Sequence, residues 1–319
     1  MKILKSNIKN LFRIILGLWI NRLYLCAMKL ETLITSGWED YALVDSGYGR
    51  KLERMAGFLI DRPEPQAMWH PRLTEADWNK ADAIFMGGNA EDESVHGRWQ
   101  NHGITGEHWQ ARYNGIQFNG MLTSFRHVGY FPEQCAHWQW LEAKAAPGKR
   151  ILNLFAYSGV HSLVAASKGA EVTHVDASKK AITWAKDNQD LNDPNWKIRW
   201  IVEDAVKFVQ REARRGNLYD GIILDPPKFG RGPDGETWDL FDDLPQLLTD
   251  CATILRPEAG SFLLLTSHAI RASAMAFGQL VANIWQDAEK QVECGELFVQ
   301  EEGSDRLLPT SMFTRLVLK

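Results

Sequence analysis

The sequence predicts an α/β protein in which a doubly wound sheet of about seven strands follows a smaller β-rich domain. Two observations support this fold class. Short apolar runs alternate with helical segments from residue 133 onward, as they do in buried parallel sheets. Residues 31–130 instead hold turn signals and aromatic side chains. The length of 319 residues, of which 45% are hydrophobic and 24% charged, suffices for about two domains.

The chain divides into three expected parts. Residues 1–30 form a basic extension, residues 31–128 a β-rich domain and residues 129–319 the α/β domain. The formal net charge of −4 includes six positive charges of the extension, so the rest of the chain is more acidic still. An acidic body argues against a protein that coats nucleic acid by bulk charge. A local basic patch stays open as an RNA contact, built from Arg126, Lys228, Arg231 and Arg271.

The extension has the pattern of a basic amphipathic helix. One side of its helical wheel carries Lys2, Lys5, Lys9 and Arg13. The apolar run 14–20 is shorter than the roughly 20 residues of a membrane span. Three interpretations stay open: a mitochondrial presequence, a helix that contacts a membrane or a partner through residues 1–20, and an extension before a start at Met28. We favour the third, which leaves the segment outside the fold.

The cysteines exclude two classes of site. The four of them, Cys26, Cys135, Cys251 and Cys294, are far apart and show no metal-ligand spacing. Neither a disulfide framework nor a bound metal is therefore expected. This cysteine usage favours a reducing compartment, and we expect the cytoplasm.

The β-rich part reads as a small mixed or antiparallel domain. Asn114-Gly115 separates residues 108–113 from residues 116–118, which is a strong hairpin signal. Residues 41–45 and 58–60 are two further expected strands. Seven of the 13 tryptophans lie between residues 31 and 149. Such rings can stack on nucleic acid bases, but they more often fill a core, and we favour the core.

The α/β part begins with an expected helix at residues 133–146, which Pro147-Gly148 ends. The expected strands are residues 151–154, 172–175, 198–202, 221–224, 262–265, 292–299 and 312–318. Helical segments stand between them up to residue 290. In such sheets ligands bind outside the carboxyl ends of the strands. Polar residues that follow the strands are therefore the candidates for a site.

The first strand is followed by Asn153-Leu-Phe-Ala-Tyr-Ser-Gly159, which holds a single glycine. A dinucleotide turn uses three glycines so that the backbone can approach a diphosphate, and no phosphate-binding P-loop sequence occurs. The remaining candidate ligand is a nucleoside without phosphates. Asp176 and Asp204 end the next two strands, where carboxylates can accept from a ribose diol and from an adenine amine. Each alone is more often a helix cap, but together they point to adenosine.

The fourth strand ends in Asp225-Pro-Pro-Lys-Phe229. Two prolines fix the backbone there, so the Asp225 carboxylate and the Pro226 carbonyl point rigidly at the crevice. The alternative is a strand end with a purely structural role.

Three runs, with the spacings they have here, resemble class I S-adenosylmethionine-dependent methyltransferases: residues 153–159, Val175-Asp-Ala-Ser178 and residues 225–229. The nearest branch is that of the bacterial large-subunit rRNA methyltransferases that make 5-methylcytosine. The resemblance covers about residues 126–265 and implies a Rossmann-like fold with S-adenosylmethionine as cofactor. The residues it assigns to the cofactor are Phe131, Glu133, Gln134, Asn153, Phe155, Tyr157, Gly159, Asp176, Ala177, Asp204, Ala205, Asp225 and Pro227. The residues it places at the transferred methyl group are Asp225, Pro226, Lys228 and Phe229.

The chain lacks the cysteine that follows the fifth strand in that branch, and it has Thr266-Ser-His268 there. A ring carbon needs a thiolate adduct before it can be methylated, whereas a nitrogen needs only an oriented lone pair. We therefore expect methylation of a nitrogen of an RNA base, with His268 as a possible base. Two other functions stay open: methylation of a small molecule or protein, and a non-catalytic module that binds the cofactor.

Overall fold

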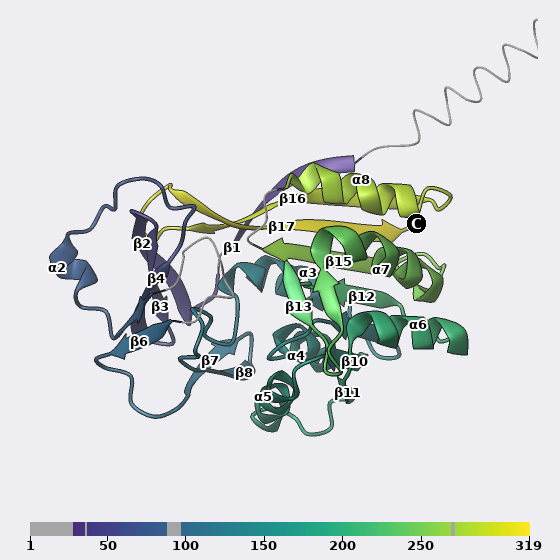
Figure 1. Cartoon of the computed structure of the whole chain (residues 1–319), viewed down its shortest axis with the longest axis horizontal. Helices are drawn as coiled ribbons and strands as arrows, with labels where there is room; N and C mark the ends of the chain where they lie inside the picture. The colour runs from purple at the N-terminus through teal and green to yellow at the C-terminus, as the bar shows by residue number, and fades with distance from the viewer. Residues whose placement is uncertain (1–27, 36, 88–96, 269–271) are drawn as a thin grey trace, which may run out of the picture.

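The computed structural model describes residues 28–35, 37–87, 97–268 and 272–319. Within them the chain forms one large sheet flanked by helices and a smaller β-rich region beside it, with a long hairpin between the two (Figure 1). The expected amphipathic helix falls on residues 1–27, outside the described residues.

The large sheet has eight strands in the order β1-β16-β17-β15-β12-β9-β10-β11. Their bounds are β1 (Met28–Thr35), β9 (Arg150–Leu154), β10 (Glu171–Asp176), β11 (Ile198–Val202), β12 (Gly221–Leu224), β15 (Phe262–His268), β16 (Lys290–Gln300) and β17 (Leu307–Leu318). Only β17 runs antiparallel to its neighbours. The doubly wound α/β class is confirmed, and all seven predicted strands are present.

The eighth strand, β1, was not predicted, and it crosses the boundary expected at residue 30. It pairs in parallel with β16 from Met28 opposite Val292 to Thr35 opposite Val299. Glu31 lies opposite Gly295, where an added Cβ atom would stand 1.8 Å from the Glu31 carbonyl oxygen. The missing side chain of Gly295 therefore lets the two backbones approach.

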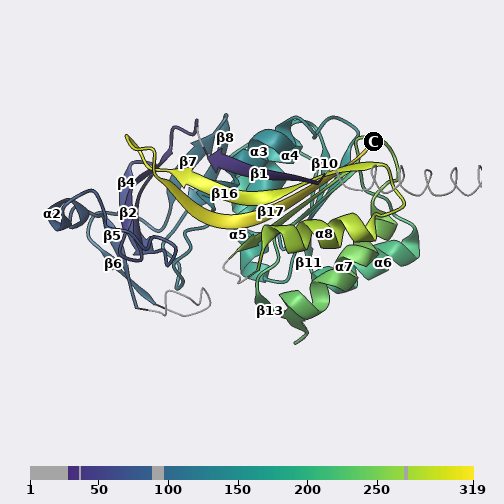
Figure 2. The same cartoon turned by 90° about the horizontal axis from the view of Figure 1, so that it is seen from above.

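Helices cover both faces of the sheet: α3 and α4 lie on one side, and α6, α7 and α8 on the other (Figure 2). The bounds are α3 (Cys135–Glu142), α4 (Val160–Ser167), α5 (Lys179–Asp190), α6 (Ala205–Arg215), α7 (Leu240–Ile254) and α8 (Ala274–Ile284), with a 3-10 turn η1 (Pro132–Gln134) before α3. Side chains that accept a backbone N–H group cap four of them: Ser178, Asp204, Asp239 and Ser273 at α5, α6, α7 and α8. In contrast, α4 has Gly159 at its N-cap position and no capping side chain.

The β-rich region consists of a five-stranded sheet, β2-β3-β4-β5-β6, and the hairpin β7-β8. The bounds are β2 (Tyr41–Gly47), β3 (Arg50–Met55), β4 (Phe58–Pro63), β5 (Ala83–Met86), β6 (Arg98–Asn101), β7 (Trp109–Tyr113) and β8 (Ile116–Gly120), with the short helix α2 (Glu75–Trp78) between β4 and β5. Asn114 and Gly115 both have positive φ, 46° and 81°, as the predicted tight turn requires.

Aromatic rings form much of the core beside this hairpin. Trp38 lies 5.3 Å from Trp138 and 5.9 Å from Phe118, centroid to centroid, in edge-on or tilted contacts. Trp109 is buried and donates to the Tyr130 hydroxyl at 3.0 Å. For these tryptophans the core interpretation is confirmed.

The β16–β17 hairpin extends beyond the large sheet and reaches β2 (Figure 1). At its tip Glu301 pairs with Leu43 as an isolated β-bridge, and the Glu302 N–H donates to the Leu43 carbonyl at 2.8 Å. The Glu301 carboxylate is 1% exposed and accepts from Ser46 Oγ at 2.6 Å and Arg72 Nε at 3.0 Å. A buried, fully paired carboxylate thus attaches the β-rich region to the large sheet.

We expect Gly295→Ala to lower the free energy of unfolding by about 1 to 3 kcal/mol, because its methyl group would push β1 away from β16. Glu296→Ala, at the next and exposed position of the same strand, should change stability by no more than about 0.5 kcal/mol. Urea unfolding of both variants tests this. Equal stability of the two would mean that the close approach of β1 contributes nothing.

Candidate active site

The strand order reverses at β9: β10 and β11 lie on one side of it, and β12 and β15 on the other. Such a reversal opens a crevice at the carboxyl ends of the two central strands, here β9 and β12. A pocket lies there. It is lined by Tyr130, Phe131, Gln134, Trp138, Asn153, Phe155, Ala156, Tyr157, Ser158, Gly159, Val160, His161 and Asp225.

Seven of the residues that the sequence predicts for the site line this one pocket: Phe131, Gln134, Asn153, Phe155, Tyr157, Gly159 and Asp225. They come from η1, from β9 and the loop after it, and from the end of β12. The sequence analysis missed the other six lining residues: Tyr130, Trp138, Ala156, Ser158, Val160 and His161. A lone histidine in an apolar helix gives no signal of its own, which is why His161 was not predicted.

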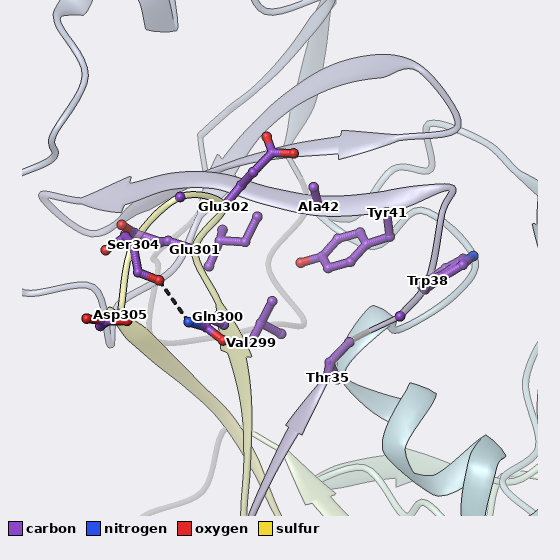
Figure 3. A pocket seen from close by; sticks show the side chains of 13 residues that line it. Thr35, Trp38, Tyr41, Ala42, Val299, Gln300, Glu301, Glu302, Ser304 and Asp305 are labelled. Atoms are coloured by element: carbon purple, nitrogen blue, oxygen red, sulfur yellow. Dashed lines mark hydrogen bonds between the residues drawn. The ribbon is translucent and has the colours of Figure 1, made fainter.

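A larger hollow of about 580 Å³ lies elsewhere, between β2 and the tip of the β16–β17 hairpin (Figure 3). Trp38 and Tyr41 line one side, and Gln300 and Ser304, which share a hydrogen bond, line the other. The carboxylate of Glu301 at this hollow is already paired with Arg72, and with Arg306, whose Nη1 atom lies 3.2 Å from Glu301 Oε1. The lining of this hollow contains none of the residues predicted for the site.

The loop between β9 and α4 has an unusual backbone. Phe155 and Tyr157 have φ values of 54° and 47°, and Gly159 has 89°. Side chains other than glycine rarely adopt this left-handed region, which costs about 1 to 3 kcal/mol at each residue. The Asp176 carboxylate holds the loop: one oxygen accepts from the Tyr157 N–H and the other from the Ser178 N–H, both at 2.8 Å.

Asp176 is thus a structural acceptor as well as a candidate ribose ligand. Burial raises its pKa, and the two backbone donors oppose that shift. Each carboxylate oxygen accepts more than one hydrogen bond, so capacity for a diol is left. Its role toward the ribose stays a prediction.

Asp225 lies at the centre of a polar network. Gln134 Nε2 donates to Asp225 Oδ2 at 3.1 Å, and His268 Nε2 lies 3.1 Å from Asp225 Oδ1. The other ring nitrogen of His268 is 3.6 Å from Glu133 Oε1. Thr266 Oγ1 donates to Gln134 Oε1 at 3.4 Å. Predicted residues from η1 and β12 therefore meet His268 of β15, where an imidazole is flanked by two carboxylates.

The other predicted residues lie outside the pocket lining. Asp204 caps α6 by accepting from the Lys207 N–H at 3.0 Å, and Ala177 and Ala205 stand beside the two aspartates. Their contacts with adenosine stay predictions.

Of the residues after β12, Pro226 is buried, and the Pro227 carbonyl accepts from Trp238 Nε1 at 2.7 Å. Lys228 and Phe229 are exposed, and the ammonium lies 5.0 Å from the centroid of the ring. This pair begins the small hairpin of β13 (Phe229–Arg231) and β14 (Thr237–Asp239). The contact of these residues with a methyl group or substrate stays a prediction.

A family model described as S-adenosylmethionine-dependent methyltransferase matches residues 92–290, more than half of the chain. The chain belongs to this family. A crystal structure of the SAM-dependent methyltransferase from Agrobacterium tumefaciens is 47% identical, superposes with a TM-score of 0.85 and covers 92% of this chain and 97% of that one. The predicted class, fold and cofactor are confirmed.

Two curated relatives are named as ribosomal RNA enzymes. Ribosomal RNA large subunit methyltransferase K/L of Pseudoalteromonas atlantica is 35% identical over 146 residues, which are 45% of this chain and 20% of that protein. Ribosomal RNA large subunit methyltransferase I of Photobacterium profundum is 30% identical over 191 residues, or 59% and 47%. The methyltransferase thus spans only a fifth to a half of the length of these relatives.

The pocket fits S-adenosylmethionine in its chemistry. The Asp225 and Glu133 carboxylates and the rings of Phe131, Phe155 and Tyr157 suit a positively charged sulfur. In the part of the chain that the structure describes, no group of His, Cys, Asp or Glu is placed to hold a metal ion. No helix among the described residues is long and apolar enough to cross a membrane.

We expect Asp176→Asn to weaken S-adenosylmethionine binding by more than about tenfold, because the amide cannot accept two backbone N–H groups and lacks the charge that favours a diol. Asp187→Asn, on the exposed side of α5, is the matched control. Calorimetric titration measures both, and circular dichroism verifies folding. A folded Asp176→Asn variant with unchanged affinity would remove Asp176 from the cofactor site.

Proposed function

We propose that this methyltransferase transfers a methyl group from S-adenosylmethionine to a nitrogen of an RNA base, with ribosomal RNA as the RNA class and the cytoplasm as the location. The observation that carries the choice of nitrogen is His268 beside Asp225, at the end of β15, where the resembling branch has its cysteine. The names of the curated relatives support RNA as the substrate.

The cysteines of the described residues support nitrogen over carbon. Methylation of a ring carbon such as C5 of cytosine needs a thiolate that adds to the ring. Cys135, Cys251 and Cys294 are fully buried, and none of them lines the pocket. Burial raises the pKa of Cys135 to about 12 and raises that of Cys251 as well. Buried, protonated thiols are poor nucleophiles.

The residues around Asp225 suit a nitrogen nucleophile. When bound, S-adenosylmethionine supplies a methyl group on a positively charged sulfur, which a lone pair displaces in line. The Asp225 carboxylate and the Pro226 carbonyl accept the hydrogens of an amine and so orient its lone pair. As the nitrogen–carbon bond forms and the sulfur–carbon bond breaks, the nitrogen becomes cationic and loses a proton, which His268 accepts.

Two parts of the chain divide this work in our proposal. Residues 129–319 hold the cofactor. Residues 31–128 contact RNA, except for the residues of β1, which belong to the large sheet. Lys228 and Arg231 are exposed on the β13 side of the crevice, where they can meet phosphates. Arg271 of the expected basic patch lies outside the described residues, and Arg126 donates to the Pro63 carbonyl at 3.3 Å.

We expect the purified enzyme to transfer labelled methyl groups to ribosomal RNA from a strain that lacks the gene, and nucleoside mass spectrometry to find the label on a base nitrogen. His268→Ala should lower kcat by about 100-fold or more and leave the affinity for S-adenosylmethionine nearly unchanged. Label found only in a small-molecule or protein fraction would contradict RNA as the substrate. Label on a ring carbon would contradict nitrogen as the methylated atom.

Replacement of all four cysteines by serine or alanine should preserve methyl transfer, because no covalent adduct with the substrate forms. Stability should fall by about 1 to 3 kcal/mol for each buried position, so the assay belongs at a temperature where the variant is folded. Loss of transfer with cofactor binding retained would show that a cysteine is the nucleophile and would return the enzyme to the carbon-methylating branch.

A further inference from the structure

Gln134 links the ends of β12 and β15 through its side-chain amide. The residue belongs to η1 and is 2% exposed. Its amide nitrogen donates to Asp225 Oδ2 at 3.1 Å and lies 3.2 Å from His268 Nε2, while its amide oxygen accepts from Thr266 Oγ1 at 3.4 Å. An amide nitrogen carries two hydrogens. These two partners use both of them, so no side-chain N–H of Gln134 is left for the cofactor.

The carboxylate of Asp225 determines which way this amide is turned. An ionised carboxylate only accepts hydrogen bonds, so the nitrogen of the amide, and not its oxygen, must face Asp225 Oδ2. Thr266, which is 1% exposed, supplies a hydrogen to the amide oxygen and supports the same orientation. The second hydrogen of the amide nitrogen is therefore presented to His268.

The orientation of the amide decides which ring nitrogen of His268 carries the proton. A nitrogen that receives a hydrogen from Gln134 must offer a lone pair, so Nε2 is the acceptor and the proton of the neutral ring stands on Nδ1. Nδ1 lies 3.6 Å from Glu133 Oε1, a carboxylate oxygen that suits an N–H group. An unprotonated Nε2 is the form that a general base needs.

Asp225 favours the opposite state of the same nitrogen. Its Oδ1 atom lies 3.1 Å from His268 Nε2, is buried, and receives no hydrogen bond among the residues that the structure describes. A proton on Nε2 would supply that bond and form an ion pair, but it would also stand against the amide hydrogen of Gln134. Gln134 thus stabilises the imidazole before it takes up a proton, and Asp225 stabilises the imidazolium afterwards.

We propose that Gln134 is a positioning residue for the methyl transfer, because its amide keeps His268 Nε2 unprotonated and directs it, with Asp225, at the methyl acceptor. The inference rests on the proposed function, in which His268 accepts the proton that the methylated nitrogen loses. That proton becomes the Nε2–H of the imidazolium, whose charge Asp225 balances, and it then passes to water. This role differs from the cofactor contact that the resemblance implies for Gln134.

The first test follows the protonation of His268 without any substrate. Histidine labelled with nitrogen-15 is incorporated into the full chain, NMR follows the ring nitrogens across pH, and His268→Ala assigns the signals. We expect the neutral ring to carry its proton on Nδ1. Gln134→Met has a similar length but donates no hydrogen bond. It should raise the midpoint of proton uptake by about 0.5 to 1 pH unit, because the imidazolium loses an unfavourable contact.

This variant retains the other titratable neighbours of His268, which among the described residues are Glu133, Asp225, His137 and His161. Gln139→Met, at an exposed position of α3 outside the pocket lining, is the matched control and should leave the midpoint unchanged. Thr266→Val removes the hydroxyl that orients the amide and should raise the midpoint by a smaller amount. Thr266→Ser should restore it.

The second test measures transfer of labelled methyl groups to ribosomal RNA from a strain that lacks the gene. We expect Gln134→Met to lower kcat about tenfold or more near pH 7 and to change the affinity for S-adenosylmethionine by less than about twofold. In the His268→Ala background it should add nothing to the loss, because both residues act in one step.

Three results would overturn the proposal. They are a neutral ring with its proton on Nε2, a midpoint that Gln134→Met leaves unchanged, and a loss of cofactor affinity as large as the loss of kcat. An unchanged kcat of His268→Ala would refute the base of the proposed function and this role with it. A lowered kcat of His268→Ala with no effect of Gln134→Met would refute the role of Gln134 alone.

Discussion

The pocket depends on one half-buried carboxylate, that of Asp176, which holds the loop between β9 and α4. Two residues of this loop, Phe155 and Tyr157, have a left-handed backbone, which costs free energy that the loop itself cannot recover. The Tyr157 N–H donates to the carboxylate of Asp176, which is the last residue of the neighbouring strand β10. Because the carboxylate fixes the loop, it also fixes the start of α4. The hydrogen bonds that hold this wall of the pocket are therefore made within the protein itself.

The second constraint is the reach of the β16–β17 hairpin. Its strands are longer than the central ones, and the buried Glu301 at its tip is bonded to Ser46 and Arg72 of the β-rich region. Loss of one partner would leave a charge buried and unpaired, which is costly. The hairpin also carries β1 along its outer edge. The surface proposed to receive the substrate is thus attached to the sheet that forms the cofactor pocket.

Local patterns predicted most of the fold and about half of the pocket. The seven strands, the Asn114-Gly115 turn and the run around Asp225 were visible because each depends on neighbours in sequence. β1 could not be predicted, since its partner β16 lies some 260 residues away in the sequence. The pairing of the two strands also depends on the absence of a side chain at Gly295. Asp204 was visible in the sequence, but its role was not. In the structure its carboxylate caps α6 by accepting from the Lys207 N–H. Sequence could not separate that role from ligand binding.

The charge distribution of the pocket bears on the whole reaction cycle. The carboxylates of Asp225 and Glu133 lie at the two ring nitrogens of His268, and aromatic rings make up much of the pocket wall. Carboxylates and the faces of rings stabilise a sulfonium cation in a site shielded from water. Methyl transfer converts this cation into a neutral thioether, which loses that stabilisation. In our proposal these groups therefore hold the cofactor more strongly than its neutral product.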